Sequence, residues 1–215
     1  MERYDKKGTM IREGIFFMMP AKRYMRYMVL AVIGLIAIVF ALAGCGGSSE
    51  DGTNETVDPE AAKTAFLEWE ARVTEIHTAA DEVLDAYNQA VTKLSEGKID
   101  IFSAYDYISN EVIPTNEKLE NAMRLVTPGD ALSKKHRETL NSASSDLANG
   151  IYWRTKGFKR FLEFMDSQKL SLMDEIKGDF EFANDYMLEG ISKYIGVKME
   201  LGLIEDEQKE QKDQK

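Results

Sequence analysis

Apolar residues recur at alternating steps of three and four positions through most of the chain between residues 58 and 203. This spacing is typical of amphipathic helices that bury one face in a bundle. Four such runs follow one another, and none of them shows the every-second-residue alternation of a strand. The pattern therefore predicts an all-α domain. In the first run the apolar positions are Phe66, Trp69, Val73, Ile76, Ala80, Val83, Tyr87, Ala90 and Leu94.

Capping residues set the expected limits of the first two helices. Asp58 precedes a proline at the first helical position, and Gly97 stands where a C-terminal glycine would end that helix. Asp100 is placed to cap the second helix, which contains Pro114. Because the apolar stripe keeps its register across this proline, we expect one kinked helix rather than two. The stripe consists of Ile101, Tyr105, Ile108, Val112, Thr115, Leu119, Ala122 and Val126.

The third and fourth helices complete the expected bundle. The segment Thr127-Pro128-Gly129-Asp130 repeats the cap-plus-proline pattern and is expected to start the third helix, and the fourth should run from about Leu170 to Leu201. Long helices joined by short turns favour an elongated, antiparallel up-down-up-down four-helix bundle. A swapped dimer or a pair of long hairpins is the alternative, because an unbroken apolar seam can also dock on a second copy.

A short motif near the start of the chain concerns its location. Leu42-Ala43-Gly44-Cys45 contains the only cysteine and follows the apolar run Met28–Ala41, which is preceded by three cations between residues 22 and 26. This arrangement resembles the lipobox of bacterial lipoproteins, in which the signal peptide is cut before the cysteine and the cysteine thiol is diacylated. The resemblance implies a signal peptide over residues 1–44 and a palmitate-type lipid anchor on Cys45. It places the rest of the chain on the extracytoplasmic face of the cell membrane.

Two alternatives concern this N-terminal region. An apolar stretch from Tyr24 through Ala43 is long enough for a single transmembrane anchor with a structural cysteine. The small residues 44–49 favour cleavage and a flexible tether instead. Residues 1–17 form an unusually long polar preface, and we interpret them as a misassigned translation start, with the true start at Met18, Met19 or Met25.

Charge and composition narrow the function of the remaining chain. We expect a lipidated cysteine and tether over residues 45–57, a helical bundle over 58–203 and a charged, disordered tail over 204–215. Residues 1–44 hold seven Lys or Arg and three Asp or Glu, so a chain beginning at Cys45 has a net charge of −14, against −10 for the whole sequence. Such an acidic domain argues against nucleic acid as a partner. With Cys45 acylated, disulfides and thiolate chemistry are excluded.

One segment of the third helix carries the candidate binding residues. Trp153, Arg154, Lys156, Lys159 and Arg160 combine four cations with aromatic neighbours in a domain that is otherwise acidic. The cations can balance carboxylates on neighbouring helices. They can also receive an anionic ligand or a lipid head group, with Arg154 in an inter-helix pocket, or they can contact a protein. The sequence leaves these three interpretations open.

Histidine is the other candidate for chemistry. The chain has two histidines, and His136 lies on the apolar stripe of the third helix, where it could ligate a metal or haem or serve as an imidazole at the edge of the core. His77 is interpreted as a boundary residue. The sequence has no Glu-x-x-His pair, nucleophile–base constellation or Gly-rich phosphate loop, so we expect neither catalysis nor a cofactor.

Taken together, the sequence predicts a membrane-anchored extracytoplasmic lipoprotein with a non-catalytic helical bundle. Its expected role is to bind a protein, a wall polymer or a small anionic ligand at the cell envelope, as a monomer or a homodimer. The alternative is a haem- or metal-carrying four-helix bundle that uses His136.

Overall fold

The computed structural model describes residues 58–204. The predicted signal peptide, Cys45, the tether and all but the first residue of the predicted tail lie outside these described residues. None of the helices between residues 58 and 204 combines the length and the apolar character that a membrane span requires.

The first helix, α2 (Pro59–Ser95), has the limits that its sequence predicts. The Asp58 carboxylate accepts a hydrogen bond from the backbone N–H of Glu60 at 3.1 Å, so it caps the helix as expected. After the helix ends, Gly97 adopts a φ of 69°, a left-handed conformation that glycine takes without a steric penalty. Phe66 and Trp69 are fully buried, and every other position of the predicted stripe is buried or partly buried.

The second helical region is continuous but not uniform. It consists of α3 (Ile101–Tyr107), a π-helical turn η1 (Ile108–Val112) and α4 (Ile113–Arg124). Within the π turn, the N–H of Ile113 bonds to the carbonyl of Ile108, five residues back. Pro114, which has no N–H and whose ring would crowd the carbonyl of residue 110, follows directly after this wider turn. The absence of a break confirms one helical region, and the kink at Pro114 stays a prediction.

After Pro114 the predicted stripe was wrong at one position. Thr115, expected to be buried, is exposed, and its neighbour Asn116 is fully buried. The later stripe positions Leu119, Ala122 and Val126 are partly or fully buried, as predicted. A π turn accommodates one residue more than an α turn, and this extra residue brings Asn116 onto the buried face.

The third helix, α5 (Lys134–Ser167), begins later than expected. Its N-cap is Ser133, whose hydroxyl accepts from the N–H of His136 at 3.2 Å. The predicted start at Thr127-Pro128-Gly129-Asp130 was wrong, because this segment packs against α2. The carbonyl of Thr127 accepts from Arg72 at 3.3 Å, and a Cβ on Gly129 would lie only 3.1 Å from the Cβ of Ala65.

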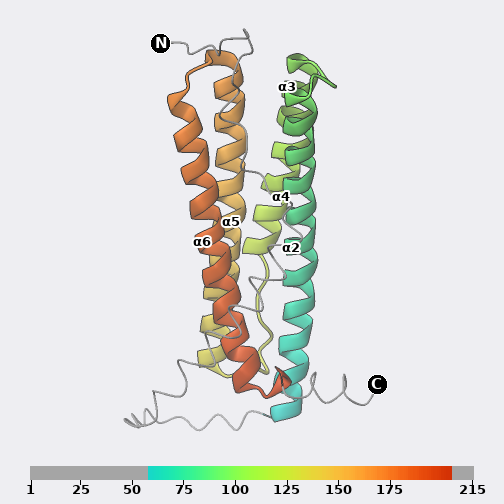
Figure 1. Ribbon diagram of the computed structural model, residues 1–215. Helices are drawn as coiled ribbons and strands as arrows, with labels where there is room; N and C mark the ends of the chain where they lie inside the picture. The colour runs from blue at the N-terminus through green and yellow to red at the C-terminus, as the bar shows by residue number, and fades with distance from the viewer. Residues whose placement is uncertain (1–57, 205–215) are drawn as a thin grey trace, which may run out of the picture. The chain divides into compact units, whose positions relative to one another are not determined.

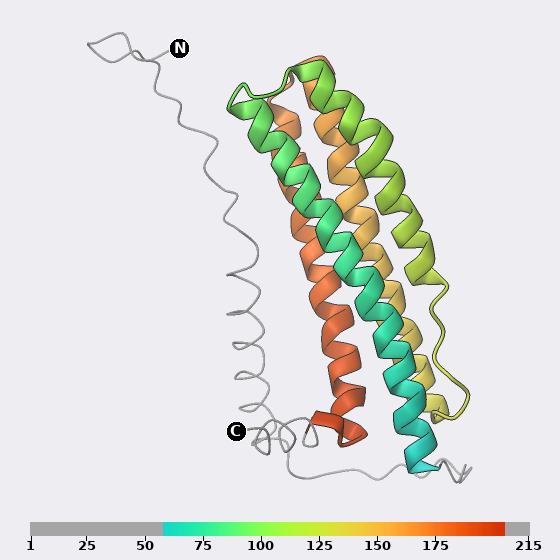
Figure 2. The same cartoon turned by 90° about the vertical axis from the view of Figure 1, so that its right-hand side faces the viewer.

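The last helix, α6 (Ser171–Glu200), lies beside α5 along its length (Figures 1 and 2). The two helices pair in opposite directions, since Lys135 contacts Glu200 at one end and Arg160 contacts Asp179 nearer the other. Glycines allow this close approach. At Gly190 an added Cβ would lie 2.8 Å from Leu147 Cγ, and Gly150 is similarly close to Met187.

Two groups of buried side chains form the core. One is centred on Trp69, Leu140 and Ile151, and the other on Tyr87 and Phe158, whose rings lie 4.5 Å apart. All regular structure between residues 58 and 204 is helical, and its helices pack against one another, so the predicted all-α class is confirmed. The up-down-up-down order of the helices stays a prediction.

Candidate binding surface on α5

The five predicted binding residues all lie on α5, and the first to consider is Arg154. Its side chain points inward and the residue is only 6% exposed. Arg154 Nη1 donates to the Asp81 carboxylate of α2 at 2.8 Å. A buried guanidinium without such a partner would be very costly. Arg154 therefore joins two helices of the bundle.

His77 lies beside Arg154 and Asp81 and forms a partly buried polar group with them. Its Nε2 lies 3.7 Å from the Asp81 carboxylate, beyond hydrogen-bonding distance, and neither ring nitrogen has a hydrogen-bond partner among the described residues. Burial lowers the pKa of His77, the Asp81 charge raises it, and the Arg154 charge lowers it further. The net shift is downward, so the imidazole is neutral at pH 7.

Lys156 and Arg160 point to the opposite side of α5, toward α6. Both approach Asp179, which is 2% exposed: Arg160 Nη1 lies 2.7 Å and Lys156 Nζ 3.8 Å from its carboxylate oxygens. Burial raises the pKa of Asp179, and the two cations oppose that shift. A buried carboxylate between two cations is a structural contact that fixes α5 against α6.

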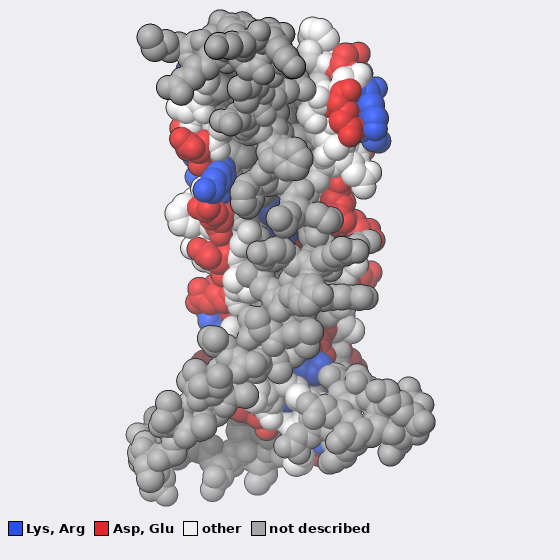
Figure 3. Space-filling view, in the orientation of Figure 1, with Lys and Arg blue, Asp and Glu red and all other residues white. Residues whose placement is uncertain are grey.

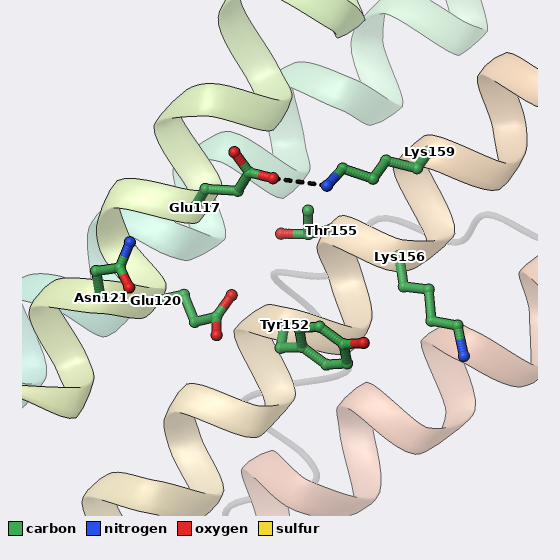
Figure 4. A pocket seen from close by; sticks show the side chains of 7 residues that line it. All are labelled: Glu117, Glu120, Asn121, Tyr152, Thr155, Lys156 and Lys159. Carbon is green, nitrogen blue, oxygen red and sulfur yellow. Dashed lines mark hydrogen bonds and ion pairs between the residues drawn. The ribbon is translucent and has the colours of Figure 1, made fainter.

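Lys159 faces α4 and borders a groove of about 350 Å³ between α4 and α5. Figure 4 shows Lys159 reaching toward Glu117, and their charged atoms lie 2.7 Å apart. Another lining carboxylate, Glu120, pairs with Arg124 at 2.9 Å. The charges at the edge of this groove are thus matched within the protein.

The structure therefore separates the four predicted cations. They pair with carboxylates on three different helices. Of the three predicted roles, balancing acids on neighbouring helices is the one that these contacts support. The partner carboxylates were not predicted individually. Asp179 directly precedes the partly buried Phe180, and periodicity alone does not distinguish such a position from that of a solvent-facing acid.

Trp153 belongs to a different feature, an aromatic surface formed by Tyr152, Trp153 and Phe182. The rings of Trp153 and Phe182 lie 4.9 Å apart, and those of Tyr152 and Trp153 lie 5.8 Å apart in an edge-on arrangement. Lys156 Nζ stands 4.1 Å from the centre of the Trp153 ring, a cation–π contact. Tyr152 is 45% exposed and Phe182 52%. Three contiguous rings from α5 and α6 are thus partly accessible to solvent.

His136 lies at the start of α5, near the end of α6. Its Nε2 is 3.0 Å from the Glu200 carboxylate, which also contacts Lys135 at 3.0 Å. Hydrogen bonds from Lys135 and His136 lower the pKa of Glu200, although burial opposes the shift. Over residues 58–204, no three His, Cys, Asp or Glu side chains gather closely enough to hold a metal ion.

Along the two edges of the face that Figure 3 shows, acidic side chains outnumber basic ones. Comparisons of the chain with protein-family models, with curated proteins and with solved structures found no match.

Proposed function

We propose that this chain is a membrane-anchored extracytoplasmic lipoprotein whose helical domain binds another protein of the cell envelope. The observation that supports binding is the aromatic surface of Tyr152, Trp153 and Phe182. Partly exposed Tyr, Trp and Phe side chains are enriched at protein–protein interfaces, where they contribute large contact areas. The proposed role of the domain is binding, without catalysis.

A protein fits this surface better than a small anion does. The cations of the predicted set are engaged by carboxylates at 2.7–3.8 Å, so an anionic ligand would have to displace an internal partner. Arg154 and Asp179 are themselves buried, and removing their partners would leave a buried charge without compensation. The aromatic surface, in contrast, gains from being covered because apolar area leaves water.

Support for the membrane anchor comes from the sequence Leu42-Ala43-Gly44-Cys45 and the apolar segment before it. In the native host, the wild-type protein should fractionate with membranes. Cys45→Ser should release the protein or leave it as an uncleaved precursor, because the acceptor for the lipid is lost. A Cys45→Ser protein that is processed and membrane-bound like the wild type would contradict the anchor.

The binding role can be tested by photo-crosslinking in the native host. A photoreactive residue placed at Tyr152 or Phe182 should give a discrete adduct with one protein. The same residue at Glu68, an exposed position on α2, serves as the matched control and should give no such adduct. Phe182→Ala should then weaken the adduct formed from position 152. Equal adducts from positions 152 and 68, or none from either aromatic position, would refute the proposed surface.

A further inference from the structure

A second groove lies between α2 and α3, on other helices than the aromatic surface. Its volume is about 490 Å³, within the range of small-ligand sites. Ala86 and Ala90 of α2 line it, and their short side chains leave its floor open. Ile99 and Tyr107 contribute apolar walls from the other side, and Tyr107 is half-exposed. The groove is thus an open channel with an apolar floor, and polar side chains such as Gln89 and Ser103 also line it.

The charges at its edge differ from those of the α4–α5 groove. Glu82, Asp85 and Lys93 line the channel, and none of them forms an ion pair or hydrogen bond with another side chain in the described part of the protein. In the α4–α5 groove, by comparison, Lys159 is held by Glu117 at 2.7 Å. Three charges bordering one channel therefore remain available to a ligand.

The negative and positive charges also lie at different ends of the channel. Lys93 follows Asp85 by eight residues and Glu82 by eleven on the same helix. At 1.5 Å per residue, the carboxylate end and the lysine end lie about 12–16 Å apart along α2. A short turn joins α2 to α3, so the lysine end lies near that turn and the carboxylate end lies away from it. The channel is consequently acidic at one end and basic at the other.

We propose that this channel binds a short, extended peptide with a free ammonium group at one end and a free carboxylate at the other. An extended chain rises by about 3.3 Å per residue, so about four residues span the distance between the two charged ends. The ammonium group meets Glu82 and Asp85, and the carboxylate meets Lys93. Small apolar side chains of the peptide lie against Ala86, Ala90 and Tyr107. This inference does not depend on the protein contact proposed above.

The test uses the full chain, purified in detergent, and calorimetric titration with tetra-alanine as the probe. Tetra-alanine with free termini should bind saturably. N-terminal acetylation and C-terminal amidation should each weaken binding about tenfold, because each removes one charge contact. Dialanine should bind more weakly than either blocked form of tetra-alanine, since it is too short to reach both charged ends of the channel. Binding of dialanine as tight as that of tetra-alanine, or no binding of tetra-alanine, would overturn the proposal.

Variants separate a true site from non-specific attraction. Asp85→Asn should weaken binding of tetra-alanine and reduce the preference for the free over the acetylated form, and Glu82→Gln together with Asp85→Asn should abolish that preference. Lys93→Gln should abolish the preference for the free over the amidated form. Glu111→Gln removes an exposed carboxylate outside the channel and should leave both preferences intact. If Asp85→Asn and Glu111→Gln have equal effects, the acidic surface as a whole attracts the peptide and the channel is not the site. The helical signal in far-UV circular dichroism verifies that each variant is folded.

Discussion

Gly190 of α6 offers a sharp test of how closely α5 and α6 pack. In Gly190→Ala, the new methyl group would lie 2.8 Å from Leu147 Cγ and 2.9 Å from the backbone carbonyl oxygen of Ala143. The leucine side chain can move, but the carbonyl belongs to α5 and can shift only with its helix. Gly178 is the matched control on the same helix, because an added Cβ there would meet no atom within 4 Å.

The two substitutions are expected to change the free energy of unfolding in opposite directions. Replacing glycine by alanine inside a helix gains about 1 kcal/mol of stability, so Gly178→Ala should be more stable than wild type by about that amount. Gly190→Ala has the same gain, but overpacking costs typically 1–3 kcal/mol. The net change at Gly190 is therefore about 0–2 kcal/mol of destabilisation, and the two variants should differ by about 1–3 kcal/mol.

Urea unfolding followed by circular dichroism measures this difference directly. In thermal unfolding, a difference of about 2 kcal/mol corresponds to about 4–8 °C in a domain of this size. Adding Leu147→Ala to Gly190→Ala should relieve only the side-chain part of the clash, since the carbonyl of Ala143 remains. Equal stabilisation by Gly178→Ala and Gly190→Ala would refute the close approach of the two helices.

Three further predictions concern other parts of the bundle. The pKa of His77 in the folded protein lies below its ordinary value of 6.5, so the folded protein binds fewer protons there and loses stability as the pH falls below about 6.5. His77→Gln should therefore reduce the loss of stability between about pH 7.5 and about pH 5.5, measured by urea unfolding. An unchanged pH dependence would contradict this prediction. Asp81→Asn leaves Arg154 without its charge partner and should cost about 2 kcal/mol, discounted for the partial exposure of Asp81; Glu75→Gln, exposed on the same helix, is the control and should be nearly neutral. Ser133→Ala removes the side-chain cap of α5 and should lower the free energy of unfolding by about 1 kcal/mol. Thr127→Ala is the control and should change this free energy little. A larger effect at Thr127 than at Ser133 would argue for the earlier helix start.

The helices themselves were predictable where local sequence and packing agree. In α2, the cap at Asp58, the glycine at Gly97 and an unbroken apolar stripe all indicate the same helix, and the structure has it. The start of α5 was not predictable by the same rule. Thr127-Pro128 is locally as good a helix start as Asp58-Pro59, but the Thr127 carbonyl is taken by Arg72, which is distant in sequence. A tertiary contact here overrides a local preference.

The burial of Asn116 in place of Thr115 was missed for a related reason. Periodicity assumes a constant number of residues per turn, and the π turn before Pro114 breaks that assumption. Asn116 became buried as a result, where its side-chain amide donates to the Ile151 carbonyl at 2.9 Å and to Thr155 at 2.8 Å. A polar residue of this kind gives no signal in a search for apolar stripes.

The candidate site was predictable in kind but not in detail. Because Arg154 falls among the apolar positions of the third helix, its guanidinium had either to reach solvent or to pair with a carboxylate on a facing helix, and Asp81 supplies that carboxylate. Which acid would do so depends on how helices face each other, and Asp81 is 73 residues away in sequence. The aromatic surface depends on Phe182 of α6 meeting Trp153 of α5, a contact that periodicity within one helix cannot predict.

The central claim is that this domain works outside the cell membrane, attached by a lipid on Cys45, where its aromatic surface can meet a partner protein. Mass spectrometry of the N-terminal peptide from the protein isolated from its own host tests this claim most directly. The account predicts a peptide that begins at Cys45 and carries the mass of a diacylglycerol group, with no peptide from residues 1–44. An unmodified Cys45 within a peptide that continues from the preceding residues would contradict it.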